Sequence, residues 1–360
     1  MKRITNILLL TATLLMTGCG GHYGIDDPNP EVLEGSYIFF DAGVTVTKGT
    51  LISGTTLPKQ TGTSFGVFGF RPNGDDVFIE YKAGENSSFD NVAKMYRQVY
   101  GGDFIYNCLA LWHPDPEPHN FYAYYPYEDN RSIITEVGSD DQYGPYINYV
   151  QPTSLDAMAD VVTAHTESTR TSDGVVNLSF DHRLFAFAVK VTNLQTQSTK
   201  DIVIKAASIE FQANTIPSSA HLYFEDTDQD GILDKATGNM MASSLNHIYE
   251  VNDTGVEAGK DYDLNSGNFF LFVPCPSLSV KISLTLVGAW GDEVTFTIPE
   301  QDEDTISDEY YSLVPLGGAG FQPGLKYFFN IKKSDKSIEF TLENADLPWN
   351  ENEDIDIGFN

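Results

Sequence analysis

The strongest constraint on the fold is a repeated alternation of apolar and polar side chains. Residues 37–47 show it clearly, because every second residue from Ile38 to Val46 is apolar and would lie on one face of an extended strand. Similar short runs follow along the chain, separated by glycine, proline, asparagine and aspartate. No amphipathic helical pattern exceeds two turns, and only a short helix is expected near 153–161. The chain is therefore predicted to be all-β.

The composition supports this fold class. The chain has 23 Phe and 19 Tyr, which favour strands, and its 30 Gly and 17 Pro supply the turns that many short strands need. Short strands at even spacing are typical of sandwiches or barrels. The predicted strands are 37–47, 65–70, 77–81, 95–100, 103–112, 121–125, 175–180, 184–192, 201–211, 221–224, 268–273, 280–289, 293–298, 327–332 and 338–342.

Length and one polar interval predict two domains. A chain of 360 residues forms one large domain or two ordinary ones. Residues 164–174 carry no large apolar side chain, so few contacts are expected to cross them. We therefore predict an N-terminal β-sandwich over residues 36–170 and a C-terminal β-sandwich over residues 175–360. Cys108 and Cys275 lie far apart in sequence and are expected to be buried free thiols.

The charge balance narrows the range of partners. Asp and Glu number 51 against 21 Lys and Arg, which gives a net charge of −30. A chain this acidic repels phosphate backbones and anionic lipid surfaces, so nucleic acid is not expected as a partner. The same acidity favours solubility outside the cell and the binding of cations.

The N-terminus has the pattern of an export signal. Lys2 and Arg3 precede an apolar run that is too short for a permanent membrane span and that ends at Cys19. The small residues before this cysteine resemble the lipobox of bacterial lipoproteins. That resemblance implies removal of residues 1–18 and lipidation of Cys19, including palmitate; an ordinary secretory peptide is the alternative. Residues 19–35 are expected to be a flexible tether, and an acidic pair within them resembles the surface-export signal of Bacteroidetes lipoproteins.

A second local motif lies at residues 226–234. Its alternating carboxylates and the turn-permitting Gly231 resemble Asp-rich calcium loops, and oxygen ligands suit a hard cation. An EF-hand is excluded, because the twelfth position is Thr237 and no flanking helices are evident. A structural calcium would neutralise charges that otherwise repel one another; the alternative is an acidic hairpin turn with solvated carboxylates. The predicted ligands are the carboxylates of Asp226, Asp228, Asp230 and Asp234 and the carbonyl of Ile232.

No pattern in the chain predicts an enzyme or a required cofactor. Residues 62–66 match the Gly-x-Ser-x-Gly pattern of hydrolases, but they lead into a strand rather than into the helix that this motif needs. The histidines lack metal-ligand spacing, and a secreted hydrolase would need converging titratable groups that the sequence does not offer. The aromatic run at 121–127 is expected to be sandwich core, and a sugar-binding platform is the alternative.

Several segments, taken in order, can be compared with known families. They are residues 65–70, 95–99, 121–126, 156–159, 176–184, 323–331 and 338–340, followed by Trp349. In this order and spacing they resemble the fimbrillin-like family of Bacteroidales, which includes the type V pilins and Mfa-like lipoproteins. The resemblance covers nearly the whole mature chain.

The resemblance implies two transthyretin-like β-sandwich domains in tandem, export as a lipoprotein to the outer membrane, and assembly into surface fimbriae or an adhesin at their tip or base. Assembly in the family uses strand donation: a protease cuts after the first strand, usually at an arginine, and a strand of another subunit fills the groove. Here the first strand is 37–47 and the cut position holds Lys48. This departure implies a different protease, or a subunit that is never cut.

Two readings of the function follow. The favoured one is a fimbrial subunit or fimbria-associated adhesin whose partners are other fimbrial subunits, joined by strand exchange. The alternative is a carbohydrate-binding surface lipoprotein that never polymerises and recognises a host or bacterial surface.

Overall fold

The computed structural model describes residues 39–41, 65–70, 93–99, 103–106, 112, 117–127, 132–140, 143–170, 174–196, 201–225, 234–236, 239–288, 291–298, 310–315, 319–335 and 337–344. These residues form strands, turns and one short 3-10 helix, η3 (Leu155–Ala157), which lies where the sequence predicts a short helix. Across these segments no helix is long and apolar enough to cross a membrane. The prediction of an all-β fold is confirmed.

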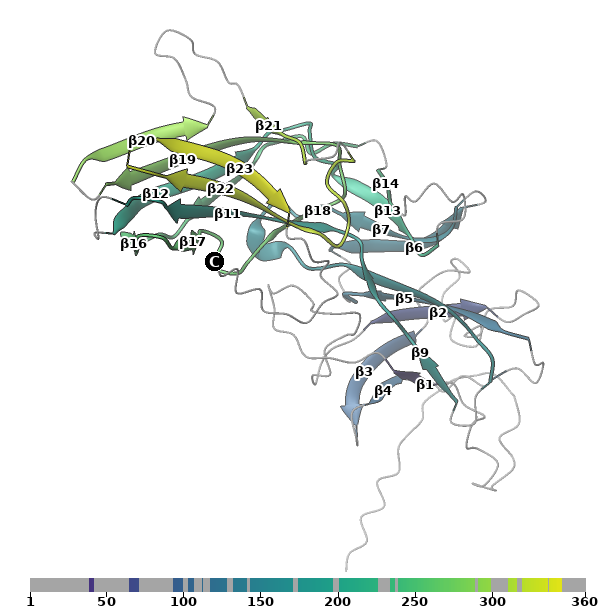
Figure 1. The fold of residues 1–360 in the computed structure, drawn as a ribbon. Helices are drawn as coiled ribbons and strands as arrows, with labels where there is room; N and C mark the ends of the chain where they lie inside the picture. Colours follow the sequence, from purple (N-terminus) through teal and green to yellow (C-terminus); the bar gives the residue numbers. More distant parts are fainter. Residues whose placement is uncertain are drawn as a thin grey trace, which may run out of the picture.

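The strands form four sheets (Figure 1). In the order of their pairing, the eight-stranded sheet contains β10 (Asp181–His182), β8 (Val162–Ser168), β5 (His119–Tyr125), β2 (Gly66–Phe70), β3 (Ala93–Val99), β4 (Asp103–Tyr106), β1 (Phe39–Asp41) and β9 (Val175–Asn177). The four-stranded sheet contains β14 (Asp234–Ala236), β13 (Ser219–Tyr223), β7 (Gly144–Val150) and β6 (Ile134–Asp140).

The other two sheets lie in the C-terminal half. The five-stranded sheet contains β17 (Asp261–Asp263), β11 (Phe185–Asn193), β22 (Lys326–Lys333) and β23 (Ile338–Asn344), with β18 (Phe270–Phe272) also paired to β11. The six-stranded sheet contains β15 (Leu245–Tyr249), β12 (Ile202–Phe211), β19 (Leu278–Val287) and β20 (Glu293–Ile298), with β16 (Thr254–Val256) paired to β12 and β21 (Tyr311–Leu313) paired to β19.

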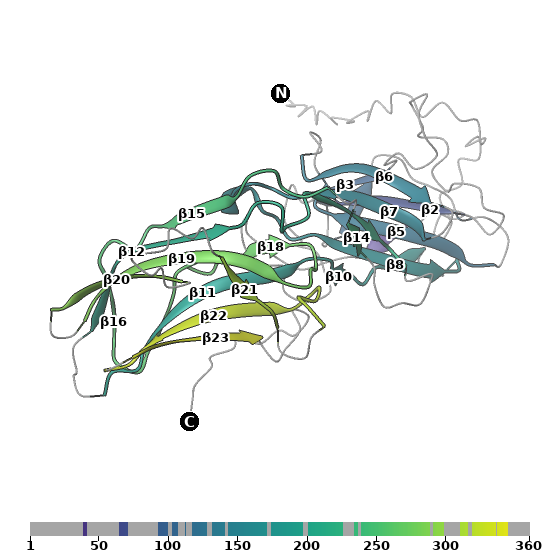
Figure 2. The same ribbon diagram turned by 90° about the horizontal axis from the view of Figure 1, so that it is seen from above.

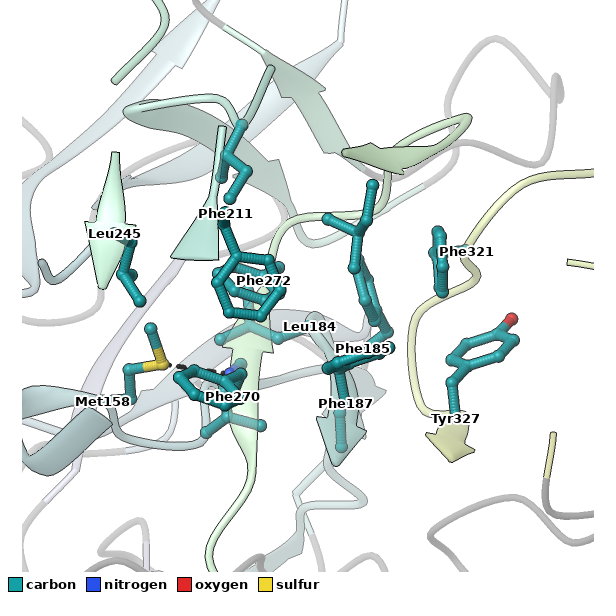
Figure 3. Close-up of a cluster of buried hydrophobic side chains, with 14 of the residues drawn as sticks. Met158, Leu184, Phe185, Phe187, Phe211, Leu245, Phe270, Phe272, Phe321 and Tyr327 are labelled. Carbon is teal, nitrogen blue, oxygen red and sulfur yellow. Dashed lines mark hydrogen bonds between the residues drawn. The ribbon is translucent and has the colours of Figure 1, made fainter. Parts of the chain in front are cut away.

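The C-terminal half is a sandwich of these two sheets (Figure 2). Every second residue of β19 is buried, as expected for a strand with one face toward a core. Aromatic rings fill the interior: Phe211 of β12 contacts Phe270 and Phe272 of β18, with ring centroids 4.9 Å apart in both pairs (Figure 3). Each such side chain, once fully buried, contributes about 1.5–3 kcal/mol to stability.

The N-terminal sandwich is completed by strands from later in the chain. β13 pairs with β7, and β14 pairs with β13, so these two later strands complete the four-stranded sheet that contains β6 and β7. Phe224, just after β13, contacts Phe68 of β2 and Tyr122 of β5 at 5.3 and 5.5 Å between ring centroids. The domain limits 36–170 and 175–360 stay a prediction, but strand pairing and core packing both cross them. One connected cluster of buried apolar residues includes members of both halves, such as Phe68 and Ile147 in the N-terminal half and Phe185 and Phe270 in the C-terminal half.

Part of the polar interval at 164–174 is a strand. Residues 164–168 belong to β8, which pairs with β5 along its whole length, from His119 opposite Ser168 to Tyr125 opposite Val162. β5 supplies buried rings at Phe121, Tyr122 and Tyr124, and His165 of β8 stacks on Tyr122 with ring centroids 4.7 Å apart. Because β5 supplies the aromatic area, β8 can form without large apolar residues of its own.

Candidate functional site

The first described strand occupies an interior position in its sheet. β1 lies between β4, with which it runs antiparallel, and β9, with which it runs parallel. Phe40 is the register partner of Phe104 on one side and of Val176 on the other. We call this position between β4 and β9 the β1 slot (Figure 1). A strand that leaves the slot exposes hydrogen-bonding groups on both neighbours, which makes the slot a candidate site for strand exchange.

β9 forms the outer side of the slot, and its residues alternate between core and solvent. Val176 is fully buried, whereas its neighbour Asn177 is exposed. The alternation continues after the strand with buried Leu178 and Phe180, and Phe180 contacts Phe65 at 5.9 Å between ring centroids. The β1 slot therefore has one face toward a packed apolar interior.

β9 and β10 lie at opposite edges of the eight-stranded sheet, although only residues 178–180 separate them in sequence. An extended chain rises about 3.3–3.6 Å per residue, so the four steps from Asn177 to Asp181 span at most roughly 14 Å. The two edges must therefore lie near one another. We infer that the sheet is strongly curled and that residues 178–180 form the corner between its edges.

The beginning of β9 is held by a buried tryptophan. The Trp112 indole Nε1 donates a hydrogen bond of 3.3 Å to the carbonyl oxygen of Gly174, the residue before β9. The same ring packs edge-on against His119 and Phe121 of β5. Gly174 has a φ of +75°, a conformation that favours glycine, so the chain turns at this residue before it enters β9.

The end of the corner is anchored by buried polar groups. His182 Nδ1 lies 3.0 and 3.1 Å from the two carboxylate oxygens of Asp160, and both side chains are almost completely buried. The Arg183 guanidinium donates from Nε to the Thr163 hydroxyl, and the Arg183 backbone N–H donates to the Val161 carbonyl at 2.9 Å. Removing one partner of a buried hydrogen bond typically costs about 1–3 kcal/mol, so these contacts hold β10 in place.

The Asp160 carboxylate also affects groups on neighbouring elements. Burial lowers the pKa of the Lys326 ammonium on β22, and the negative charge of Asp160 partly opposes this shift. Burial raises the pKa of the Tyr149 hydroxyl on β7, and Asp160 raises it further. Asp160 thus contacts His182 of β10 and acts electrostatically on groups of β7 and β22.

The structure leaves most predicted site residues untested. Cys19 and Lys48 lie outside the described residues, and so does the calcium-loop segment from Asp226 to Ile232. Asp234 is placed only by its backbone, as the first residue of β14 opposite Leu222 of β13. Among the described side chains, no group of three His, Cys, Asp or Glu residues could hold a metal ion.

The residue before the acidic loop is tied to the N-terminal sheet. The Tyr122 hydroxyl donates a 2.5 Å hydrogen bond to Glu225 Oε1, and His165 Nε2 lies 3.3 Å from the same oxygen. Burial raises the pKa of the Tyr122 hydroxyl, and its hydrogen bond to Glu225 adds to the effect. The described residues on either side of the acidic motif are therefore both held in place, Glu225 by Tyr122 and β14 by its pairing with β13.

The structure bears on two alternatives, a sugar-binding platform at residues 121–127 and a hydrolase motif at residues 62–66. In the aromatic run at 121–127, Phe121, Tyr122 and Tyr124 are buried, so this part of the run is core, as the sequence favours. Gly66, the last glycine of the hydrolase-like pattern, lies in β2, where an added Cβ would be 2.2 Å from a ring carbon of Tyr124. This glycine makes room for a core tyrosine rather than for a nucleophile elbow.

The outer side of the six-stranded sheet carries two hollows, of about 770 and 430 Å³, which share Ile248. Ile248 is 79% exposed. The smaller hollow is lined by hydroxyl, amide and charged side chains, among them Ser208, Glu210 and Lys281, and by the ring of His247. An open aromatic cleft would favour the carbohydrate-binding alternative, and the lining of the larger hollow includes one aromatic residue, Tyr249.

The sequence did not identify the corner of the curled sheet as part of the site. The pattern was present, since alternate residues from Val176 to Leu184 are all buried in the structure. It indicates an extended segment correctly. It does not show that the segment pairs with β1, more than 130 positions earlier in the chain.

One solved structure has a similar fold with a TM-score above 0.5, and two others are less similar. A fimbrial protein from Bacteroides vulgatus superposes with a TM-score of 0.56 at 19% identity, covering 87% of this chain and 99% of that one. A candidate cell adhesion protein from Bacteroides uniformis has a TM-score of 0.47 at 15% identity, covering 87% and 98%. A fimbrial assembly protein from Parabacteroides distasonis has a TM-score of 0.34 at 13% identity, covering 86% and 96%.

The search of curated proteins gave no match. The family comparison is more informative: the model described as fimbrillin-like matches residues 53–346, most of the chain, and this span includes every described strand except β1. The chain therefore belongs to the fimbrillin-like family.

Proposed function

We propose that this protein is a fimbrial subunit or fimbria-associated adhesin that assembles by strand donation at the β1 slot. The observation that carries the proposal is the position of β1, a short strand paired on both sides inside a sheet that is otherwise built from residues 66–182. The family and the fimbrial and adhesion proteins of similar fold support a role at the cell surface.

Strand donation suits the energetics of this slot. A strand of another subunit that replaces β1 forms one set of backbone hydrogen bonds in place of another, so the net cost of exchange is small. Its apolar side chains can fill the space beside buried Val176. Cutting the chain after the first strand makes exchange easier, because the strand is then held only by non-covalent contacts.

We further propose that Cys19 carries the lipid anchor and that residues 19–35 act as a tether to the outer membrane. Two acyl signals give stable anchoring where one does not. The proposed calcium at residues 226–234 has a structural role, since it would order the connection between β13 and β14. This connection joins two paired strands of the four-stranded sheet.

The test of the assembly proposal is limited proteolysis of the soluble mature chain. A lysine-specific protease should cut first at Lys48, and the nicked protein should form larger oligomers in light scattering than the intact protein. Lys48→Gln should remove both the early cut and the gain in assembly, while the matched variant Lys59→Gln should remove neither. Nicking at Lys48 without any gain in assembly would contradict the proposal.

A further inference from the structure

β9 depends on the β1 slot for its place in the sheet. Within the described strands β9 pairs with β1 alone, through three register pairs, and it has no strand on its other side. β4, on the opposite side of the slot, also pairs with β3 and keeps that partner whatever happens in the slot. Loss of the slot strand therefore removes the one strand pairing that β9 makes among the described strands, whereas β4 stays paired with β3.

The segments on either side of β9 have contacts that do not involve β1. Before the strand, Gly174 accepts the hydrogen bond from Trp112, and after it Phe180 packs on Phe65. Further on, β10 is held by the buried pair of His182 with Asp160. β9 is thus a three-residue strap between two fixed points, and its strand pairing is the part of its contacts that depends on the slot.

We propose that β9 closes over whichever strand occupies the β1 slot and selects that strand by its direction and register. This inference rests on the proposed strand donation and adds the means by which a donor is recognised. The partner is an extended segment of another subunit that runs parallel to β9 and antiparallel to β4, as β1 does. A segment entering in the opposite direction would not reproduce the hydrogen-bond spacing of the parallel pair.

The register adds a side-chain requirement. Directly paired residues of neighbouring strands share one face of the sheet. The donor position at the register of Phe40 faces the same side as fully buried Val176, so it must be apolar. The next position, at the register of Asp41, shares the exposed face of Asn177 and accepts a polar residue. An apolar residue followed by a polar one, in the parallel direction, is the pattern that β9 selects.

The experiment uses the full mature chain with a disrupted slot strand. Phe40→Pro removes a backbone N–H from β1, and Phe40→Leu is the matched control. Hydrogen exchange is measured at residues 174–178 and, as a control for folding, in β19. Because the chain has three Trp, replacing Trp290 and Trp349 by Phe leaves Trp112 as the single tryptophan, so tryptophan emission reports on the start of β9.

We expect Phe40→Pro to accelerate exchange at residues 174–178 about tenfold or more, with a red shift of Trp112 emission and no change in β19. Phe40→Leu should resemble the parent. A peptide with the sequence of residues 37–47 should restore protection, whereas a peptide with the reversed sequence should not. Unchanged exchange at 174–178 in Phe40→Pro, or equal rescue by the reversed peptide, would overturn the proposal.

If Phe40→Pro also accelerates exchange in β19, the variant disturbs the whole fold, and Phe40→Ala is used in its place. The exchange rate at residues 174–178 and the rescue by the forward but not the reversed peptide then decide. Assembly of nicked protein is measured separately by light scattering, so the two ideas fail independently. If nicked protein assembles but exchange in β9 does not respond to Phe40→Pro, the proposed selection by β9 is wrong and strand donation is not affected. If exchange in β9 responds to Phe40→Pro but nicked protein never assembles, strand donation is not the function.

Discussion

Removing the ring of Phe224 should destabilise the N-terminal sandwich, although this residue lies beyond the predicted N-terminal domain. Its side chain is 4% exposed and packs edge-on against Phe68 and Tyr122. A buried Phe→Ala replacement costs about 3–5 kcal/mol, from lost transfer free energy and the cavity left behind. Since whole domains are stable by only about 5–15 kcal/mol, this is a large fraction of the total.

The assay is urea unfolding followed by circular dichroism, together with hydrogen exchange in β2 and β5. Phe224→Ala should lower the free energy of unfolding by about 3–5 kcal/mol and should accelerate exchange in both strands. The matched control is Ile248→Ala, an apolar truncation at a side chain that is 79% exposed, where the change should stay within about 0.5 kcal/mol.

Two results would refute the reasoning. A loss below about 1 kcal/mol for Phe224→Ala would mean that its ring contributes little to the interior of the N-terminal sandwich. If exchange accelerates only in strands of the C-terminal sandwich, Phe224 stabilises that sandwich, although β13 pairs with the N-terminal strand β7.

Three further predictions concern the anchor, the acidic loop and a surface ion pair. Cys19→Ala should release the protein from the membrane fraction, and unchanged fractionation would contradict lipidation. Millimolar calcium should raise the melting temperature relative to chelator, and replacing Asp226, Asp228 and Asp230 by Asn should abolish the rise; equal melting in both buffers would favour a plain acidic hairpin. Burial raises the pKa of Glu343, but hydrogen bonds from Lys332 and two neighbours outweigh it and the net pKa is lowered. Because the pKa of Glu343 is lower in the folded state, its carboxylate stabilises the fold at pH above its unfolded-state pKa. This stabilisation is lost as the pH falls through the folded-state pKa. Urea unfolding at decreasing pH should show the loss, and Lys332→Gln should make it smaller.

The alternation of side chains was enough to predict the fold class and most long strands of the C-terminal half. β12 and β19 were predicted because their buried and exposed residues alternate without interruption over most of their length. β6 and β7 were missed, because Gly138 and Gly144 suggest turns when read alone. In the structure Gly138 lies in a strand opposite Tyr146, where an added Cβ would be 2.6 Å from that tyrosine's ring.

The site was less predictable than the fold, for a physical reason. A lipidation motif is local, so Cys19 can be read from its neighbours in sequence. The β1 slot is made by pairing Phe39–Asp41 with Val175–Asn177, and a parallel pair over such a distance leaves no pattern in either segment. The acidic motif at 226–234 can be recognised from neighbouring residues in the sequence. The hydrogen bond between Glu225 and Tyr122 cannot, because the two residues are far apart in the chain.

The central claim is that β1 must leave its slot for subunits to assemble, and a reversible lock tests it most directly. Asp41 and Asn177 are register partners, and neighbouring strands place such residues within the Cα range of a disulfide. A chain with cysteines at these two positions and serines at the three native cysteines is oxidised and nicked at Lys48. We predict that the oxidised protein stays monomeric and that reduction restores assembly to the level of the unlocked chain. Equal assembly with the lock closed would contradict strand donation through the β1 slot.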